Sequence, residues 1–397
     1  MEQMKVAIVF PSGHFVTTPC ISSLAILLAQ RGIQVDIYTA VNTSSTKESS
    51  FSFLRDIPNL NLYLYFMKIG TFLENIPLIL AGFMPWFIIK QHKKNYDLVI
   101  AAGIRGLFIL GIWSYFSRIK FAFLCLELYL NKEQRSFKGR IVKALEGFFN
   151  RRAKFVIIQD ELRGKILQRE NHYKGKILIF PNTGLIETGN LGPDKDRLKT
   201  FGINGKKVAL YAGNIYSKWA MTAELSTAAL TWPEDWVLLL HSKARMTDDE
   251  KQTSLQVGAL GRKIFFSNDT LDEYDYEALV KSVDVGIALY DGGVSENLYY
   301  LGYSSGKISQ YLRCGIPVIV NRLPLIDQLV EEYDCGYIVD NLSQISKFLT
   351  DISNNYNYFS RNAKKAFLKK LNPALYIDQI VEVVSFISNN LLKNQRN

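Results

Sequence analysis

Apolar residues in this chain gather in short runs separated by amphipathic segments, a pattern typical of alternating strands and helices. Runs of about four to eight apolar residues that end at turn residues indicate strands buried on both faces of a parallel sheet. The runs that predict strands are, in the first half, 6–10, 35–39, 60–66, 98–102, 121–126, 155–159 and 177–180, and in the second half 208–211, 237–240, 264–266, 285–289 and 318–320. These two sets predict an α/β fold with two parallel sheets.

The segment between the two sets predicts a linker. Residues 187–207 are rich in Gly, Lys, Asp and Asn and contain no apolar run. A chain of 397 residues also exceeds what one hydrophobic core usually supports. We therefore expect a first domain at 1–186, the linker at 187–207 and a second domain at 208–372, with a C-terminal helix at 373–397 packing back towards the first domain. Two βα repeats joined in this way predict two Rossmann-like domains that face each other across a cleft.

The excess positive charge lies in the first half of the chain. Residues 1–190 hold 24 Lys and Arg against 13 Asp and Glu, a balance of +11, whereas the remaining residues hold 23 against 24. Residues 132–154 combine eight basic and two acidic residues with a run of apolar positions: Phe137, Ile141, Val142, Leu145, Phe148 and Phe149. A basic amphipathic helix of this kind suits an anionic membrane surface. A solvated helix with a buried apolar stripe is the alternative, and no nucleic-acid-binding motif accompanies the charge.

Other features bear on the cellular compartment. Residues 69–89 are strongly apolar, but Glu74, Pro77 and Pro85 interrupt them, which favours a buried or surface-dipping helix over a membrane span. The apolar run near the N-terminus has six residues, which is short for a signal peptide. The four cysteines are far apart and indicate neither a disulfide framework nor a zinc site. We expect a cytoplasmic protein, peripheral at the inner face of the cell membrane.

One stretch carries the clearest chemical signal. Residues 304–320 read S-S-G-K-I-S-Q-Y-L-R-C-G-I-P-V-I-V, which predicts a helix that begins at Ser304, Ser305, Gly306 and Lys307, a stop at Gly315 and a buried strand. The first turn of a helix presents unpaired backbone N–H groups and a positive dipole end, so it holds anions. Lys307 would add a cation there. The alternative is an ordinary capped helix that leads into a core strand.

Two positions in the first domain suggest acceptor chemistry. The loop P-S-G-H follows the first strand, so Gly13 and His14 are acceptor-site candidates, unless Gly13 only makes the turn. Glu127 follows the fifth strand, where a buried carboxylate is costly unless it is used or paired. Pairing with an arginine such as Arg105 is the structural alternative. The acidic pair Asp194 and Asp196 lies in the linker and is better explained as solvated charge than as a metal site.

In this order, the motifs resemble the GT-B glycosyltransferases, close to glycosyltransferase family 4 and related bacterial polysaccharide enzymes. The resemblance rests on the G-H loop, the P-N-T-G turn at 181–184, Y-A-G-N at 211–214, and K-x-S-Q-Y-L-R-C-G-I-P-V-I-V after S-V-D-V-G-I-A-L-Y. It covers nearly the whole chain. The fold that it implies is α/β, of the GT-B type.

The resemblance also implies a donor site in the second domain. Lys307 and the amides at Ser304, Ser305 and Gly306 would bind the diphosphate, and Gly213 would admit the sugar phosphate. Lys218 would add a second cation, although it lies one residue nearer to the glycine than in the family. The other implied donor contacts are Gln310 at the ribose, Asn268 and Asp269 at the base, and the strand-end residues Asn214 and His241. Glu127 takes the place where many members carry an acceptor-facing histidine.

Members of the family commonly carry two glutamates that this sequence lacks. The corresponding positions here are Gly302 and Gln310. Glu296 is near but out of register, so retention of anomeric configuration stays open. A helix end and basic side chains can neutralise a leaving diphosphate, so no metal and no cofactor is required. If the acceptor hydroxyl needs a base, Glu127 or His14 is the candidate.

Together these features predict a hexosyltransferase-like glycosyltransferase. It would move a sugar from a nucleotide-diphosphate sugar to a glycan or lipid-linked glycan in bacterial cell-surface polysaccharide synthesis. A nucleotide-sugar epimerase is an alternative within enzymes, but the chain has only four histidines for acid and base chemistry. The alternative from another class is a non-catalytic subunit that binds nucleotide sugar or docks on a membrane, which the missing glutamates favour.

Overall fold

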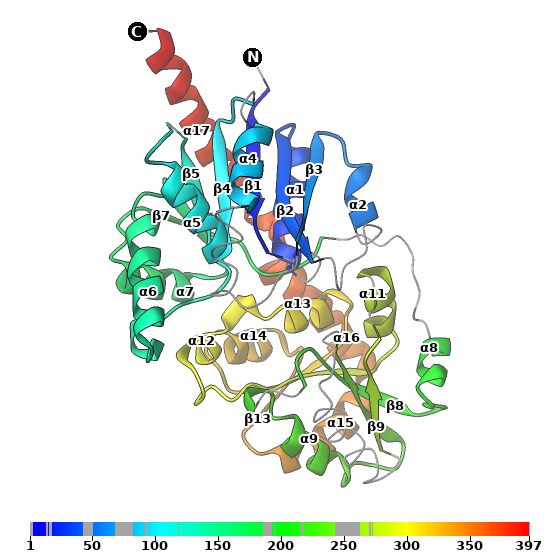
Figure 1. The fold of residues 1–397 in the computed structure, drawn as a ribbon. Coiled ribbons are helices and arrows are strands. Elements are labelled where there is room, and N and C mark those ends of the chain that lie inside the picture. Colours follow the sequence, from blue (N-terminus) through cyan, green and yellow to red (C-terminus); the bar gives the residue numbers. More distant parts are fainter. Residues whose placement is uncertain are drawn as a thin grey trace. The chain divides into compact units, whose positions relative to one another are not determined.

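The computed structural model describes residues 3–12, 15, 18–42, 51–67, 82–91, 94–117, 119–185, 193, 195–215, 218–242, 263–269, 271 and 273–396. The chain forms two compact units (Figure 1). Unit 1 comprises Met1–Leu185 and Asn372–Asn397, and unit 2 comprises Ile186–Leu371. Each contains a parallel sheet with helices, so the predicted α/β class is confirmed.

Unit 1 is built on a seven-stranded parallel sheet in the order β3-β2-β1-β4-β5-β6-β7. All seven apolar runs predicted in the first half are strands. Their bounds are β1 Lys5–Phe10, β2 Gln34–Asn42, β3 Leu60–Met67, β4 Leu98–Ala102, β5 Phe121–Leu124, β6 Phe155–Ile158 and β7 Lys176–Ile179. Val6 pairs with Val35 on one side and Leu98 on the other. The interiors of the five inner strands are buried because helices cover both faces of a parallel sheet, whereas the edge strands β3 and β7 are only partly buried.

The helices of unit 1 follow the strands in turn. They are α1 Pro19–Gln30, α2 Ser52–Arg55, α4 Met84–Gln91, α5 Gly103–Trp113, α6 Phe137–Asn150, α7 Glu161–Asn171 and α17 Ile377–Arg396, with short 3-10 turns η4 Asn131–Glu133 and η9 Pro373–Leu375. Helix α1 begins with Pro19, whose missing N–H costs nothing in a first turn, and ends before Gly32, which has φ 79°.

Helix α17 completes the core of unit 1 although it comes from the end of the chain. Its residues Ile377, Ile380 and Val384 are fully buried in the same core as α1. Arg31 and Asp378 form an ion pair at 2.8 Å, and the Ser388 hydroxyl donates to Asp97 at 2.6 Å. The last helix therefore packs as an integral part of the first unit.

Unit 2 has a six-stranded parallel sheet in the order β10-β9-β8-β11-β12-β13. Its strands are β8 Lys207–Ala212, β9 Trp236–His241, β10 Ile264–Ser267, β11 Val285–Ala288, β12 Val318–Asn321 and β13 Gly336–Val339. The first five match the predicted runs. The edge strand β13 was missed, because G-Y-I-V is short, begins with glycine and is only partly buried.

The helices of unit 2 are mostly short. They are α8 Lys195–Thr200, α9 Thr222–Ala229, α11 Glu273–Lys281, α12 Glu296–Tyr299, α13 Gly306–Arg313, α14 Ile326–Tyr333, α15 Ile345–Asn354 and α16 Tyr356–Ala366, with the turns η5 Lys218–Ala220, η6 Gly302–Ser304, η7 Leu342–Gln344 and η8 Phe367–Leu371.

In both sheets the strand order reverses beside the first strand. The reversal lies between β1 and β4 in unit 1, and between β8 and β11 in unit 2. In open parallel sheets, ligands bind outside the carboxyl ends of the strands at such a point, because the following loops diverge to opposite faces there. The topology alone therefore singles out the residues that follow β8 and β11.

Part of the predicted linker belongs to unit 2. Within 187–207 the structure has helix α8, and Leu198 and Ile203 are buried in the core of that unit. Arg197 of α8 pairs with Asp275 of α11 at 2.9 Å. Leu198 and Ile203 are five positions apart, so they do not form the apolar run that would have predicted a strand or helix. Their burial nevertheless anchors this segment in unit 2.

The structure describes Asp196 of the acidic pair and residues 82–89 of the apolar segment 69–89. Asp196 is exposed and pairs with Lys199 at 2.7 Å, whereas Asp194 lies outside the described residues. No cluster of three His, Cys, Asp or Glu side chains with metal-binding geometry occurs in the described part of the chain, and the four cysteines are free thiols. Residues 69–81 also lie outside it; among the helices that are described, none is long and apolar enough to cross a bilayer.

Candidate functional site

The helix that begins after Ser305 has the geometry that its sequence predicted. Helix α13 starts at Gly306, and the Ser305 hydroxyl caps it by accepting from the Ile308 amide at 3.4 Å. The Tyr290 hydroxyl lies 2.7 Å from the same Ser305 oxygen and holds the cap in place. Gly315, with φ 73°, ends the helix and leads into β12. Lys307 is therefore the second residue of the helix.

The ammonium group of Lys307 is the unusual feature of this helix end. The residue as a whole is half-buried, but its Nζ is buried and has no hydrogen-bond partner in the described structure. Nζ lies over two aromatic rings, 3.7 Å from the ring centroid of Tyr211 and 4.8 Å from that of Tyr290. Cation–π contacts offset only part of the lost hydration. Burial accordingly lowers the pKa of Lys307 to about 7. A buried cation without an anion indicates a site for an anionic ligand.

The elements around Lys307 meet at the point where the strand order of unit 2 reverses. Tyr211 is in β8, and Tyr290 follows β11. The backbone of Tyr290 is fixed by Asn321, the last residue of β12, through hydrogen bonds at 2.9 and 2.8 Å. The Trp219 ring stacks on the ring of Tyr290, with their centroids 6.0 Å apart. The carboxyl ends of three strands thus place the rings that hold the lysine.

Gly213 is required by this arrangement. It follows β8 with φ 135°, a conformation that side chains rarely adopt. A Cβ atom there would lie 3.3 Å from Lys307 Nζ. Any larger residue would occupy space beside the ammonium group. The structure therefore brings together Gly213 and Lys307, two of the predicted donor residues.

The remaining predicted donor residues lie around the same sheet edge with different environments. Asn214 is exposed beside Gly213, and the Ser304 hydroxyl donates to the Leu301 carbonyl at 2.6 Å. Gln310, one turn after Lys307, accepts a hydrogen bond from Arg313 at 3.0 Å. Lys218 opens η5, but its side chain lies outside the described atoms.

Three more predicted residues follow the two strands on the far side of β8. His241 ends β9 and is buried, with Nδ1 3.0 Å from the Ser267 hydroxyl and its ring stacked on Tyr276. Asn268 and Asp269 follow β10 and are exposed. The three residues lie at or after the ends of strands β9 and β10, at the carboxyl edge of the same sheet.

The prediction for Glu127 was wrong in one respect. Strand β5 ends at Leu124, and the Glu127 side chain is exposed, whereas Cys125 and Leu128 on either side are buried. The chain turns after the strand, and the Cys125 thiol donates to the Glu127 carbonyl at 3.2 Å. The burial that the prediction assumed for this carboxylate is therefore absent. The other acceptor candidates, Gly13 and His14, lie outside the described residues.

Sequence reasoning missed the aromatic residues that surround the ammonium group. The signal was present, because A-L-Y-x-G occurs twice, at 209–213 and 288–292. Both copies stand at the carboxyl ends of strands, β8 and β11, which are neighbours in the sheet. A repeated tyrosine at two adjacent strand ends beside the switch point would have identified Tyr211 and Tyr290.

Comparison with solved structures defines the class of fold. Sucrose-phosphate synthase from Thermosynechococcus elongatus superposes with a TM-score of 0.72 at 15% identity, covering 96% of this chain and 99% of that one. HepE of Anabaena, in complex with UDP-glucose, gives 0.69 at 15% identity, with 96% and 100% covered. A putative UDP-N-acetylglucosamine 2-epimerase from Listeria monocytogenes gives 0.57 at 13% identity, with 99% and 95% covered. The chain has the two-domain α/β GT-B fold, as predicted.

A narrower match covers the second part of unit 2 and the start of the C-terminal segment that belongs to unit 1. Residues 273–383 match the family described as Glucosyltransferase 3-like, C-terminal domain. This region contains Tyr290, the helix start at Ser305 and Lys307. A search of curated protein sequences gave no match. The predicted relation to glycosyltransferase family 4 in particular stays a prediction.

Replacing the buried cation should weaken anion binding and leave the fold intact. Because Lys307 would form charge-assisted hydrogen bonds with a diphosphate, we expect Lys307→Ala to weaken binding of a nucleoside diphosphate by about 1.5 to 3 kcal/mol. The matched control is Lys347→Ala, an exposed lysine on α15. Isothermal titration calorimetry measures both affinities, and unchanged affinity in the Lys307 variant would contradict the assignment.

Proposed function

We propose that the protein is a glycosyltransferase that takes a sugar from a nucleotide-diphosphate sugar and binds the diphosphate at Lys307. The observation that carries this proposal is the buried ammonium group at the start of α13, which has no hydrogen-bond partner among the described residues and lies beside the reversal of strand order. A diphosphate would supply the missing negative charge. The GT-B fold and the Glucosyltransferase 3-like match at 273–383 support the same class of reaction.

The chemistry follows from where charge develops. When the bond between sugar and diphosphate breaks, negative charge grows on the leaving diphosphate, and groups already aimed at it lower the barrier. Protonated Lys307 and the free amides in the first turn of α13 would stabilise that charge. This set needs no metal and no cofactor, so we propose metal-independent transfer of a hexosyl unit. His241, Asn268 and Asp269 would bind the nucleotide farther along the same edge.

The donor and acceptor classes are part of the proposal. Solved complexes of HepE contain UDP-glucose, UDP with glucose, or UDP, which makes a UDP-sugar the first donor to test. We propose a glycan or lipid-linked glycan acceptor bound by unit 1, in bacterial cell-surface polysaccharide synthesis. The protein would work in the cytoplasm, peripheral at the inner membrane face, for which the basic excess of the first half is the support.

A non-catalytic subunit is the second candidate, and a specific observation favours it. Gly302 replaces the first glutamate of the resembled family and has φ 48°, where a glutamate would be strained. Gln310 replaces the second, and its side-chain oxygen is held by Arg313. Arg313 in turn pairs with the buried Glu277 at 2.5 Å. The geometry around both positions is therefore adapted to the present residues.

A donor screen separates these functions. We expect one class among UDP-, GDP-, dTDP- and CMP-sugars to raise the melting temperature, because a ligand at about 100 times its Kd adds about 2.7 kcal/mol to folding stability. Turnover of that donor with a panel of acceptors would then establish a transferase. Tight binding with no turnover on any acceptor supports the non-catalytic subunit, and conversion of the free nucleotide sugar to its epimer supports an epimerase. Stabilisation by none of the four would contradict a donor site.

Donor affinity should depend on pH because of Lys307. In the free protein its pKa is lowered to about 7, and a bound diphosphate would raise it again. Below pH 7 the lysine is already charged, so affinity is flat. Above pH 7 binding must take up a proton, so affinity falls by up to about tenfold per pH unit. A nucleotide sugar suits the titration, because its doubly esterified diphosphate does not titrate in this range. This decrease of affinity with pH should be absent in Lys307→Ala. An equal decrease in both proteins would show that a group other than Lys307 takes up the proton.

The role of Glu127 can be tested without loss of folding, because its side chain is exposed. We expect Glu127→Gln to lower turnover by about a hundredfold with donor affinity preserved, as removal of a general base does. Glu161→Gln, at an exposed position in the first turn of α7, is the control. Near-normal turnover in Glu127→Gln would move the proposed base to His14.

A further inference from the structure

Helix α6 presents a row of large apolar side chains to solvent. Phe137 is 74% exposed, Ile141 44%, Leu145 37% and Phe148 45%. Spacings of four, four and three residues place them along one face of the helix. We call these four residues the α6 stripe. The sequence left open whether this segment has a buried or an outward apolar face; in the structure Val142 and Phe149 are buried, and the stripe faces outward.

Two aromatic residues after α5 extend the stripe. Tyr115 is 52% exposed and Phe116 is 77% exposed. The Tyr115 ring stacks on Phe148 of the stripe, with centroids 6.2 Å apart and planes at 7°. The guanidinium group of Arg152 lies over the Tyr115 ring, 3.9 Å from its centroid. Tyr115 thus extends the stripe into one surface formed by α6 and the end of α5, and the exposed Phe116 is the next residue along the chain.

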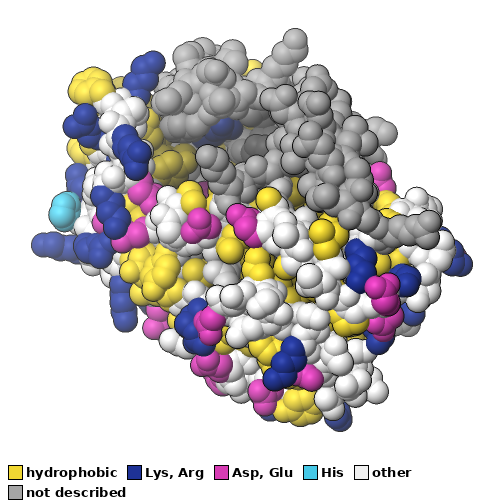
Figure 2. Space-filling model, turned by 90° about the horizontal axis from the view of Figure 1, so that it is seen from below, with side chains coloured by type: hydrophobic (Ala, Val, Ile, Leu, Met, Phe, Trp, Pro, Cys, Tyr) yellow, Lys and Arg dark blue, Asp and Glu magenta, His cyan; other side chains and the backbone are white. Residues whose placement is uncertain are grey.

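The charge around this surface is almost entirely positive. Figure 2 shows Lys and Arg side chains, with hydrophobic ones among them, gathered at the left of the view, the side on which Figure 1 draws α6 and α7. The exposed basic residues are Lys132, Arg135, Lys138, Arg140, Arg151, Arg152 and Lys154. Of the two acids in this segment, Glu146 is buried and Glu133 is half-buried. The exposed face therefore combines apolar and cationic side chains.

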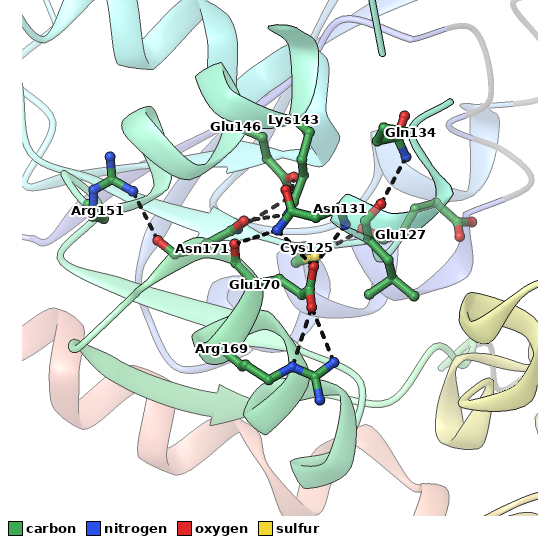
Figure 3. Close-up of polar contacts among 11 residues, drawn as sticks. Cys125, Glu127, Asn131, Gln134, Lys143, Glu146, Arg151, Arg169, Glu170 and Asn171 are labelled. Carbon is green, nitrogen blue, oxygen red and sulfur yellow. Dashed lines mark hydrogen bonds and ion pairs between the residues drawn. The ribbon is translucent and has the colours of Figure 1, made fainter. Parts of the chain in front are cut away.

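A buried polar cluster fixes the helix in this orientation. Lys143 and Glu146 are 3% and 1% exposed, and they form an ion pair at 2.8 Å. Asn171 at the end of α7 accepts from Lys143 at 2.5 Å and donates to Glu146 at 3.4 Å (Figure 3). Arg151 donates to the Asn171 carbonyl at 3.1 Å. Rotating α6 to bury the stripe would break these bonds, and losing one partner of a buried ion pair is strongly destabilising.

We propose that the α6 stripe, together with Tyr115 and Phe116, is a docking surface for an anionic lipid bilayer. Aromatic and aliphatic side chains enter the boundary between headgroups and acyl chains, and basic side chains around them contact anionic headgroups. A second copy of the chain suits the surface less well. A twofold contact would place its cations against the same cations of the partner. This proposal rests on the membrane location that is part of the proposed function and names the surface that would provide it. Because the surface does not depend on glycosyl transfer, it can be tested apart from donor binding and turnover.

The first experiment measures binding of the full chain to vesicles. The probes are vesicles of phosphatidylcholine alone and of phosphatidylcholine mixed with phosphatidylglycerol, at low and at physiological ionic strength. We expect binding to the mixed vesicles that weakens as salt rises, because screening reaches about 8 Å at physiological ionic strength. Phe116→Ser/Phe137→Ser should lower the partition coefficient by about tenfold or more, since two large apolar side chains no longer insert.

The control variant removes apolar surface of the same unit elsewhere. Leu375→Ser/Phe386→Ser changes residues that are 52% and 69% exposed in the C-terminal segment of unit 1. We expect this variant to bind vesicles like the unchanged protein. Lys138→Gln/Arg140→Gln tests the charge: each exposed cation near an anionic surface contributes about fivefold to binding, so about twenty-five-fold should be lost. Thermal unfolding checks that all variants fold.

Three results would overturn the proposal. The unchanged protein could ignore the anionic vesicles at low salt, or the stripe variant could bind them as well as the control variant does. In the third, the unchanged protein sediments as a dimer and the stripe variant as a monomer, with vesicle binding equal in both. That outcome would make the surface an interface between copies of the chain. Donor binding by Lys307 is unaffected by any of these results.

Discussion

Parallel pairing around one central strand in each unit decides where every candidate functional side chain lies. Strands β1 and β8 are buried on both faces and hydrogen-bonded on both sides, so neither can shift without moving its neighbours. A shift of one residue would exchange the two faces of a strand. All strands of a parallel sheet end at the same edge, and this is why Gly213 and Tyr290, 77 positions apart, both lie beside Lys307.

This framework places Lys307 where its charge is costly until a ligand arrives. The lysine is held over Tyr211 and Tyr290 with no anionic partner among the described residues, and folding of unit 2 has already removed water from its ammonium group. A ligand that brings negative charge therefore gains attraction without having to strip water from the cation. The surface of α6 in unit 1 shows the opposite distribution. There a cation and an anion are buried as a pair, and apolar groups face solvent.

The sequence predicted the framework better than the details. Each predicted apolar run is a strand, and in the inner strands burial on both faces explains the continuous signal. The edge strand β13, which has four residues and begins with Gly336, left none. The helix start at Lys307 was predicted from adjacent residues. The burial of Lys143 depends on Asn171, 28 positions away, which no local pattern contains. Exposure of Glu127 depends on a turn two residues earlier than the predicted end of β5.

Unit 1 is built from two separate segments of the chain, and this affects the order in which the protein can fold during synthesis. Residues 1–185 leave the ribosome first, but the outer face of α1 stays uncovered until Ile377, Ile380 and Val384 have been made. Unit 2 is continuous and has all its core residues by Leu371. A nascent chain therefore completes its second unit before its first, and the incomplete unit carries exposed apolar surface for most of translation. Ribosome stalling or premature termination between Leu371 and Ile377 would leave unit 1, rather than unit 2, as the substrate for chaperones and proteases.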